Sequence, residues 1–493
     1  SSRSALSRRD FLIRSTAAGT ATALTISFGS GLEAVSDASA AVRQSFTPSI
    51  WFTMTPDGKT NMHIVKAEMG QHIGTALAQI IAEELELDWN DVTLDYPEGS
   101  AVNFGKYGLA HTANSGSITT EFDRLSRAGA AGRMLLIEAG AKLLGTVPGA
   151  CYASKSTVIE KESGRSVTYS EILSQTTIDR KFSHPDDFRD APRKSIKDYK
   201  LIGKSVPSID IPNKTNGKAK YGIDVFVPGM VYGTLVVPRS RYGSKVVDVD
   251  ETDALKIPGF LRAVTINDSS GICTGWVVAV AEKFPAAVKA AKALKVTWDP
   301  GPYGDVSSDG LTAEHKEIQK DPNAGANWVL QGDVDAALAG VDEVLEWEYT
   351  TDMVAHAPME PLNATVAKFG DTWHVWQGTQ GTSFARMTLE GVLSGALGVD
   401  ASEIKVVIHQ SVLGGGFGGR QDNDEIIAAA LASHDIGRPV KLIQTRESQM
   451  ATGSPRTPSY HKVRAGLKNG ELSAMEHDIV AGWSGARVGA PGW

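Results

Sequence analysis

Cysteine is scarce in this 493-residue sequence, which holds only Cys151 and Cys273, far apart along the chain. Cysteine-ligated iron–sulfur clusters and cysteine-based zinc sites need several thiolates, so the chain supplies neither of these sites and no disulfide framework. Basic residues are too few for a general nucleic-acid binder, because 49 Lys and Arg against 57 Asp and Glu give a net charge of −8. After the N-terminal 40 residues, no apolar run approaches the ~18 residues of a membrane-spanning helix. We therefore expect no spanning helix in the mature chain.

The remaining composition is typical of a soluble globular protein. Hydrophobic residues make up 42% and charged residues 22% of the chain, which excludes wholesale disorder and fibrous repeats. At roughly 150 residues per domain, the length predicts about three domains. Glycine is enriched, with 50 residues in the chain against a usual share of about 7%, and the glycines are clustered.

The first 40 residues have the three parts of an export signal. Residues 7–12 (SRRDFL) contain adjacent arginines, residues 17–28 are weakly apolar, and residues 38–40 (ASA) offer a small-residue cleavage site. Paired arginines followed by Phe-Leu are typical of a twin-arginine signal. We therefore expect a periplasmic protein, associated with a membrane at most through an uncleaved signal or partner subunits. A basic amphipathic arm is the alternative.

Helices and strands are both expected along the mature chain, which predicts an α+β fold. A Pro-Asp-Gly turn at 56–58 between strand-like runs predicts a hairpin, and apolar spacing predicts helices at 75–85 and 119–144. A polar, proline-containing connection spans 176–215. The later expected strands are 235–237, 277–280, 295–298, 343–349, 372–376, 404–409 and 440–445, and the later expected helices are 284–294, 383–393 and 424–434.

Four loops of small and polar residues each lead into an expected helix: 68–74, 112–117, 378–382 and 414–420. Glycine lets the backbone come close to a ligand, and successive N–H groups at a helix start attract anions. Taken singly, each loop could be a tight turn with a helix cap, and the spacing of Asp422 to Glu425 resembles a capping box. The glycine run at 414–419 exposes more backbone than a plain turn requires. It lacks the Gly-Lys-Ser/Thr of a phosphate loop and fits a dinucleotide fingerprint poorly.

These motifs resemble those of a known family. The run GGGFGG at 414–419, the pair Thr379-Gln380 and EMGQ at 68–71 are similar to the pterin-binding motifs of the molybdenum hydroxylases, the xanthine dehydrogenase and aldehyde oxidase family. AHAPMEP at 355–361 resembles a strand-end motif of that family, and GKAKY at 217–221 resembles its α/β-hammerhead domain. Here EMGQ precedes the glycine run. This permuted order resembles the branch that contains the large subunits of isoquinoline 1-oxidoreductase and periplasmic aldehyde dehydrogenases.

The resemblance implies a domain organisation and a chemistry. The expected parts are a signal peptide at 1–40, a permuted N-terminal segment of a molybdopterin-binding domain at 41–195, a hammerhead domain at 196–305, and the rest of the molybdopterin-binding domain, incomplete at its C-terminus, at 306–493. The implied cofactor is molybdenum–molybdopterin cytosine dinucleotide. The implied reaction oxidises an aldehyde or N-heteroaromatic C–H with water as the oxygen source. Electrons would pass to [2Fe–2S] clusters on a small iron–sulfur subunit and onward through a cytochrome c subunit.

The resemblance also implies roles for particular residues. Gln380 would donate a hydrogen bond to an oxo group of the metal, and the alternative is a solvent-facing loop glutamine. Phe417 would wall the substrate pocket; the alternative is a core aromatic, which is compatible with that role. His356 and Glu360 are expected to be structural and hydrogen-bonded. No side chain of this chain is expected to ligate the metal itself. The expected cofactor-binding residues are Gly70, Gln71, Asn114, Ser115, Gly116, Ser117, Gln380, Gly415, Gly416, Phe417 and Gly418.

The sequence departs from the family pattern at several places. His72 stands where the family usually has glycine, and Gln421 stands where purine-oxidising members have an acid, which counts against xanthine as substrate. The family's base, a glutamate in a Gly-x-Gly-Glu loop, has no match here; Glu68 and Glu360 are the only acids in the motifs, and neither is assigned as base. Three alternatives therefore stand beside a large subunit cut at its C-terminus: a non-catalytic degenerate homologue, one half of a split enzyme, and an exported flavin oxidoreductase.

Overall fold

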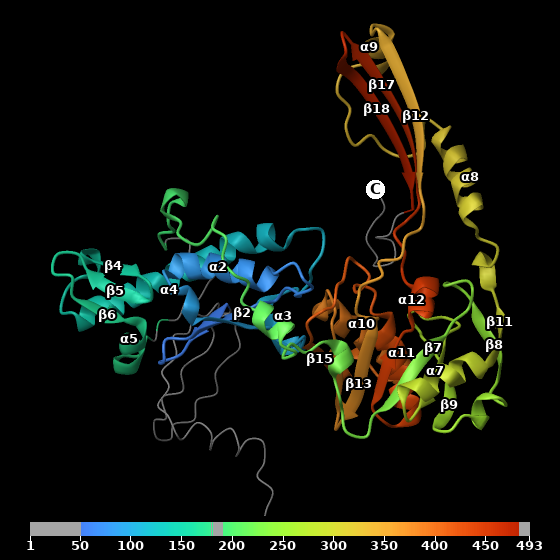
Figure 1. Ribbon diagram of the computed structural model, residues 1–493, viewed down its shortest axis with the longest axis horizontal. Coiled ribbons are helices and arrows are strands. Elements are labelled where there is room, and N and C mark those ends of the chain that lie inside the picture. Colours follow the sequence, from blue (N-terminus) through green and yellow to red (C-terminus); the bar gives the residue numbers. More distant parts are fainter. Residues whose placement is uncertain (1–50, 179, 181–190, 483–493) are drawn as a thin grey trace, which may run out of the picture. The chain divides into compact units, whose positions relative to one another are not determined.

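The computed structural model describes residues 51–178, 180 and 191–482 (Figure 1). The chain divides into two compact units that alternate along the sequence. The first unit comprises Ser1–Val225, Asp371–Thr388 and Lys405–Gly414, and the second comprises Phe226–Gly370, Leu389–Ile404 and Gly415–Trp493. The expected signal peptide lies outside the described residues. Helices and strands are interspersed, so the expected α+β class is confirmed.

The first unit begins with the expected hairpin. Strands β1 (Phe52–Met54) and β2 (Thr60–His63) pair antiparallel on either side of the Pro-Asp-Gly turn, and Gly58 adopts the positive φ of 84° that this turn requires. Strand β3 (Val92–Asp95) joins them parallel to β2. This small sheet packs its apolar side chains into the core of the unit.

Two long helices supply the rest of that core. Helices α2 (Ile73–Leu85) and α4 (Ser117–Leu143) confirm the helices expected at 75–85 and 119–144, and they pack against each other (Figure 1). They lie in close contact at Gly129, where an added Cβ would lie only 2.7 Å from the Cβ of Glu84. Glycine is therefore required at this crossing. The buried Glu83 of α2 accepts backbone N–H bonds from Lys200 and Ile202 at 2.9 and 3.0 Å, which fixes the polar connection onto this helix.

Strands β14 (Thr372–Gln377) and β15 (Lys405–Gln410) form a parallel pair that also belongs to the first unit. Gln377 lies opposite Gln410 at their carboxyl ends, so the loops after both strands start at the same edge. Open α/β sheets commonly bind ligands at this edge.

The remaining helices and strands of the first unit are α3 (Ala101–Tyr107), β4 (Cys151–Ser154), β5 (Thr157–Glu160), β6 (Ser166–Thr168), α5 (Tyr169–Gln175), α6 (Ile211–Thr215) and α10 (Thr382–Leu397), which continues into the second unit.

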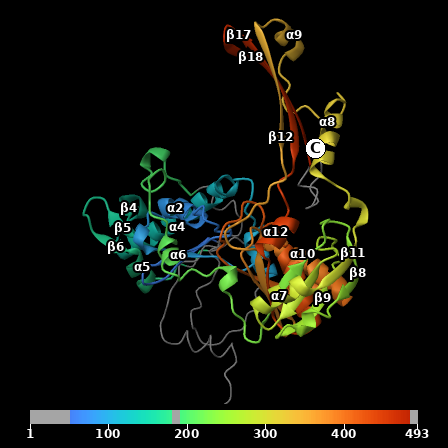
Figure 2. The same ribbon diagram turned by 45° about the vertical axis from the view of Figure 1, so that its right-hand side comes forward.

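The second unit contains a five-strand arrangement in the order β13-β16-β7-β10-β9. Helix α7 packs on β7, β10 and β9, and α11 packs on β13, β16 and β10. Figure 2 shows α7 beside β9. The strand expected at 295–298 exists as β11 and pairs with β8, a strand that the sequence did not reveal. The bounds are β7 (Val231–Val236), β8 (Lys245–Asp250), β9 (Phe260–Thr265), β10 (Val277–Ala281), α7 (Phe284–Ala293), β11 (Lys295–Asp299), β13 (Asn363–Phe369), α11 (Asp424–Ile436), β16 (Val440–Ile443) and α12 (Arg446–Thr452).

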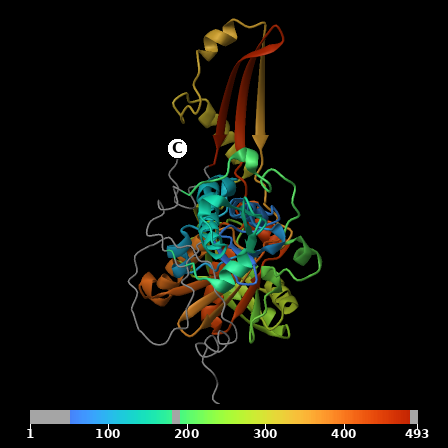
Figure 3. The ribbon, with the colours of Figure 1, turned by 90° about the vertical axis from the view of Figure 1, so that its left-hand side faces the viewer.

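A separate three-stranded antiparallel sheet completes the second unit, with strand order β12-β17-β18 (Figure 3). Its strands are β12 (Glu343–Thr351), β17 (Ser459–Lys468) and β18 (Glu471–Ala481). Helices α8 (Ser308–Gln319) and α9 (Val334–Ala339) contact β17 and β18. Asn469 and Gly470, with φ of 55° and 80°, make the tight turn between β17 and β18.

Two further expectations concern helices. The capping box expected at Asp422 and Glu425 is wrong, because α11 begins after Asn423, which has φ of 60° and caps no N–H with its side chain. The left-handed backbone at Asn423 turns the chain into the helix instead. Within the described ranges, no helix combines the length and apolar character needed to cross a membrane.

Candidate functional site

Three of the four small-residue loops are joined within the first unit. The backbone carbonyl of Gln380 accepts a bond from the Thr112 N–H at 2.7 Å, and the Gln380 side-chain amide donates to the Thr112 carbonyl at 3.0 Å. Leu413, just before the glycine run, donates its N–H to the Glu68 carbonyl at 3.0 Å. Within the first unit, the loop at 378–382 is therefore bonded to the loop at 112–117, and the loop at 68–74 is bonded to the segment just before the glycine run.

Gln380 itself is buried, with only 4% of its surface exposed. The alternative of a solvent-facing loop glutamine is therefore wrong. Its carboxamide carries two N–H hydrogens, one of which it donates to Thr112. The glycines before and after Gln380 have little space for a side chain. An added Cβ at Gly378 would lie 2.9 Å from Leu413, and one at Gly381 would lie 3.0 Å from the His111 ring.

A small pocket lies beside Gln380 in the same unit. Two of its lining residues carry a buried polar atom, Gln410 Oε1 and the Tyr96 hydroxyl, that has no hydrogen-bond partner among the described residues. Burial, reinforced by the charges of Glu68 and Asp210, raises the pKa of Tyr96, so its hydroxyl stays protonated and can donate. The lining residues are Ile64, Val65, Lys66, Ala67, Tyr96, Pro97, Ala110, Thr379, Gln380, Thr382 and Gln410.

Gln410 is a site residue that the sequence did not reveal. It is the last residue of β15, and its side-chain amide donates to the carbonyls of Thr379 and Ser411 at 2.9 and 3.1 Å. It therefore ties the residue before Gln380 to the segment that leads into the glycine run. Its position at a parallel strand's carboxyl end, four residues before Gly414, was the available signal.

Backbone strain is concentrated in the expected motifs. Ten non-glycine residues have positive φ in the described part of the chain, and six of them lie in or beside these motifs. Such conformations are uncommon outside glycine and tend to occur at binding and catalytic sites, so their distribution supports the motif assignment. The six are His72, Asn114, Ser115, Ala357, Phe417 and Asn423.

The first loop is closed by its own side chains. Gln71, which is exposed, accepts the Met69 N–H at 2.8 Å and donates to the Ala67 carbonyl at 2.9 Å. Glu68 accepts the Gly70 N–H at 2.9 Å. In this arrangement Gln71 shapes the loop, and its expected contact with a pterin stays a prediction.

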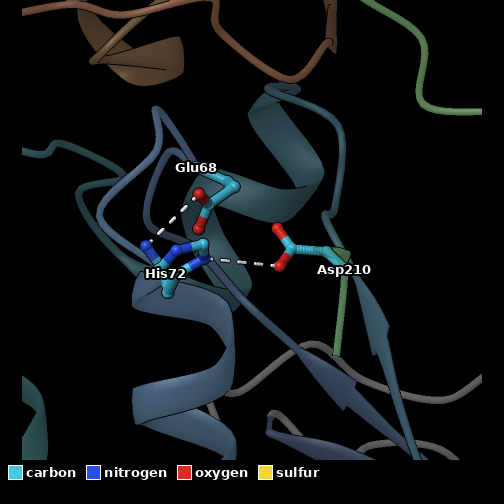
Figure 4. A group of neighbouring side chains, drawn as sticks. All are labelled: Glu68, His72 and Asp210. Atoms are coloured by element: carbon cyan, nitrogen blue, oxygen red, sulfur yellow. Dashed lines mark hydrogen bonds and ion pairs between the residues drawn. The ribbon is translucent and has the colours of Figure 1, made fainter. Parts of the chain in front are cut away.

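Glu68, His72 and Asp210 gather at the start of α2, with potential ligand atoms within 4.8 Å of one another (Figure 4). A cation is already provided by the chain: the Lys214 ammonium lies 2.8 Å from Glu68 and 2.6 Å from Asp210. Although burial opposes both effects, Lys214 lowers the pKa of Asp210 and the two acids raise the pKa of Lys214. The cluster is therefore an internal ion-pair network, and Glu68 is already neutralised by Lys214.

His72 shows how the chain accommodates its departure from the family pattern. Its backbone takes the left-handed conformation, with φ of 60° and ψ of 36°, which glycine adopts without strain. Its ring is held by the Ser208 hydroxyl at 2.8 Å. A histidine therefore occupies a backbone conformation that glycine adopts without strain, at the expense of local strain.

The glycine run belongs to the second unit from Gly415 onward and is held by a fully buried arginine. Arg420 donates from Nε to the Gly415 carbonyl at 2.9 Å, and from Nη2 to the carbonyl and the carboxylate of Glu360, both at 2.9 Å. Glu360 also accepts from Asn363 at 2.9 Å. Burial lowers the pKa of Arg420 while Glu360 opposes that shift. The expectation that Glu360 is structural is confirmed.

Two glycines of the run, Gly418 and Gly419, pack against His356. An added Cβ would lie 3.1 Å from the His356 ring at Gly418 and 3.0 Å from its Cβ at Gly419, so a side chain at either position would crowd the histidine. Phe417 has a positive φ of 56°, and 58% of its surface is exposed. The alternative of a core aromatic is therefore wrong. Its carbonyl accepts a bond from Arg456 at 2.7 Å, which fixes the strained residue.

Comparison with known proteins identifies related chains. Two models described as molybdopterin cofactor-binding domain match residues 316–488 and 7–201. The chain is 38% identical over 482 residues to the membrane-bound aldehyde dehydrogenase [pyrroloquinoline-quinone] of Gluconacetobacter polyoxogenes, covering 97% of this chain and 60% of that protein. It is 30% identical to the beta subunit of isoquinoline 1-oxidoreductase from Brevundimonas diminuta, covering 97% of this chain and 64% of that protein.

A third relative, a nicotinate dehydrogenase subunit of Pseudomonas putida, is 28% identical over 442 residues, covering 87% of this chain and 35% of that protein. The chain therefore spans somewhat less than two thirds of the length of the first two relatives. The matched regions include all four small-residue loops.

Proposed function

Since the chain belongs to the xanthine dehydrogenase and aldehyde oxidase family of molybdenum hydroxylases, we propose that it is the cofactor-binding part of an oxidoreductase large subunit. The proposed reaction oxidises an aldehyde or an electron-poor carbon of an N-heteroaromatic ring, and water supplies the oxygen atom. The observation that carries this proposal is the bonding of the buried Gln380 to the loop at 112–117, beside a pocket whose lining residues include Gln410 and Tyr96, each with an unpartnered buried polar atom.

Each unit, considered alone, contains residues that suit binding of a molybdopterin. In the first unit, Gln410 and Tyr96 offer one acceptor and one donor that no described residue uses. In the second unit, Gly415, Phe417 and Gly418 have positive φ, a backbone form that can turn successive N–H groups toward an anion. When bound, the molybdenum centre would supply the oxygen transfer and accept two electrons, which is chemistry that no side chain provides.

We assign the chain's own residues supporting roles in this reaction. Gln380 would donate an amide hydrogen to an oxygen on the metal, from a position fixed by Thr112. The backbone N–H groups of Gly415, Gly416 and Gly418 would face cofactor oxygens, and Phe417 would wall the substrate pocket. Gly70, Gln71, Asn114, Ser115, Gly116 and Ser117 would contact the pterin and its nucleotide end, for which we propose the cytosine dinucleotide form.

The proton acceptor is not assigned to this chain. Glu360 is bound to Arg420, and Glu68 to Lys214, so each acid already has a cationic partner. A general base must reach the proton that it removes and be free to accept it. We therefore place the base, together with the other pocket wall, in a part of the large subunit that corresponds to the portion of the relatives that does not align with this chain.

Electron transfer requires partners. Cys151 and Cys273 are both buried and burial raises the pKa of each thiol, which suits packing and not cluster ligation. We propose a small [2Fe–2S] subunit and a cytochrome c subunit as the onward path. Periplasmic location by the twin-arginine route and the hammerhead assignment of 196–305 are parts of the same proposal.

An oxidation assay on the complete enzyme with its iron–sulfur partner tests the reaction. Aliphatic aldehydes, benzaldehyde, isoquinoline and nicotinate are offered with an artificial electron acceptor in H2¹⁸O. We expect at least one class to be oxidised with ¹⁸O in the product. Turnover without ¹⁸O in the product would contradict hydroxylation by water, and a fully loaded enzyme that is inactive on every class would favour the degenerate homologue.

A further inference from the structure

The two faces of the β12–β17–β18 sheet differ sharply in composition. On the first face, the register places Leu345, Ala465 and Met475 in one row, and Trp347, Val463 and His477 in the next row. The third row holds Tyr349, His461 and Ile479. Strand partners in direct register point to the same side, so these nine residues share one face, called here the apolar face. None of them carries a formal charge when its histidines are neutral.

The opposite face carries the charges and is already covered. Lys316 of α8 pairs with Glu348 at 3.4 Å, Gln319 of α8 donates to Asp478 at 3.0 Å, and Asp335 of α9 accepts from Arg464 at 2.8 Å. Figure 3 shows the three strands broadside. Both helices therefore stabilise the polar face.

The apolar face, by contrast, is exposed. Trp347 is 42% exposed and Tyr349 53% on β12, and Met475 is 51% exposed and Ile479 57% on β18. Both of these strands are sheet edges, nine and eleven residues long. Contiguous exposed apolar side chains mark an interaction surface, and long open edge strands are normally paired or covered.

We infer that the apolar face is the docking surface for the rest of its own large subunit. The occupant is the polypeptide that corresponds to the unaligned portion of the relatives, whether it is joined to this chain or separate from it. The first two relatives align over 97% of this chain but only 60% and 64% of their own length, so each contains substantial polypeptide without a counterpart here. A surface without charges suits a permanent contact, since transient subunit interfaces are more polar. This inference rests on family membership and alignment, and not on the proposed reaction.

Thiol labelling of introduced cysteines tests the inference. Met475→Cys and Ile479→Cys place thiols on the apolar face of β18, and Glu346→Cys places one on the opposite face of β12, the other edge strand. The native Cys151 and Cys273 are buried and give a slow background. Alkylation rates, read peptide by peptide by mass spectrometry, are compared between the 493-residue chain and the complete large subunit, or the chain mixed with the remaining polypeptide.

We expect Met475→Cys and Ile479→Cys to react about tenfold or more slowly when the remaining polypeptide is present, because a buried thiol loses access to the reagent. The rate at Glu346→Cys should not change. Equal rates at all positions would overturn the inference. So would protection in the 493-residue chain alone: if it grows with concentration, a second copy is the occupant, and if it does not, the chain covers the face itself. Protection that requires the iron–sulfur subunit would also overturn it.

A measurement without substitutions guards against misfolded variants. Hydroxyl-radical oxidation of the native Met475 is compared with that of Met450 on α12, whose exposure of 57% is similar to the 51% of Met475. Oxidation of Met475 should fall relative to Met450 in the complete subunit. An unchanged ratio would contradict the inference even if every cysteine variant failed to fold.

Discussion

Replacing Gln380 by alanine is expected to lower kcat of the complete enzyme by about 10²–10³, the usual effect of removing one hydrogen-bond donor aimed at developing charge. The measurement is kcat per bound molybdenum, because the Gln380 side chain also holds the Thr112 carbonyl and its loss could reduce cofactor retention. Normalising to molybdenum separates the two effects.

Gln319→Ala provides the matched control for this experiment. It makes the same truncation at a half-buried position on α8, where the amide donates to the Asp478 carboxylate at 3.0 Å. Its kcat should equal that of the wild type. A Gln380→Ala enzyme with wild-type kcat per molybdenum would contradict the assignment of a donor role to Gln380.

Replacing Arg420 by methionine is expected to lower the free energy of unfolding by about 3–5 kcal/mol, the usual loss when one partner of a buried ion pair is removed. Arg420 is fully buried, and its loss would leave the Glu360 carboxylate without its cation and the Gly415 carbonyl without its donor. Urea unfolding followed by circular dichroism measures the change.

The surface pair of Arg438 and Glu282 supplies the control. Their side chains are 39% and 46% exposed, so Arg438→Met should cost less than about 1 kcal/mol. Glu360→Gln in the Arg420→Met background should recover part of the loss, because the uncompensated buried charge is removed. An Arg420→Met protein as stable as Arg438→Met would show that the buried pair does not hold the glycine run.

Local patterns in the sequence were sufficient for the local elements. The Pro-Asp-Gly turn predicted the β1–β2 hairpin, and apolar spacing predicted α2 and α4, because these features depend on residues near one another in the chain. The glycine run and Gln380 were likewise recognisable as motifs. The hairpin of β17 and β18 was missed, although Asn469-Gly470 between alternating segments is a strong hairpin signal.

Long-range contacts explain most of what sequence reasoning missed. Lys214 contacts Glu68 across 146 positions, and Gln380 contacts Thr112 across 268 positions. Contacts between residues so far apart in the chain produce no periodic pattern in the sequence. The capping box at Asp422 failed for a different reason: the left-handed backbone at Asn423 moved the helix start by one residue, and spacing alone cannot reveal that conformation. The unpartnered atoms of Gln410, at the end of β15, and of Tyr96, just after β3, could be found only in the three-dimensional structure.

The central claim is that this chain binds a molybdopterin. The printed name of one relative instead includes pyrroloquinoline quinone. Metal and nucleotide analysis of the purified, mature large subunit distinguishes these cofactors directly. The account predicts about one molybdenum and about one CMP, released by acid hydrolysis, per subunit, with no quinone, because the cofactor carries the chemistry that the chain lacks. A protein without molybdenum that carries stoichiometric pyrroloquinoline quinone would contradict it.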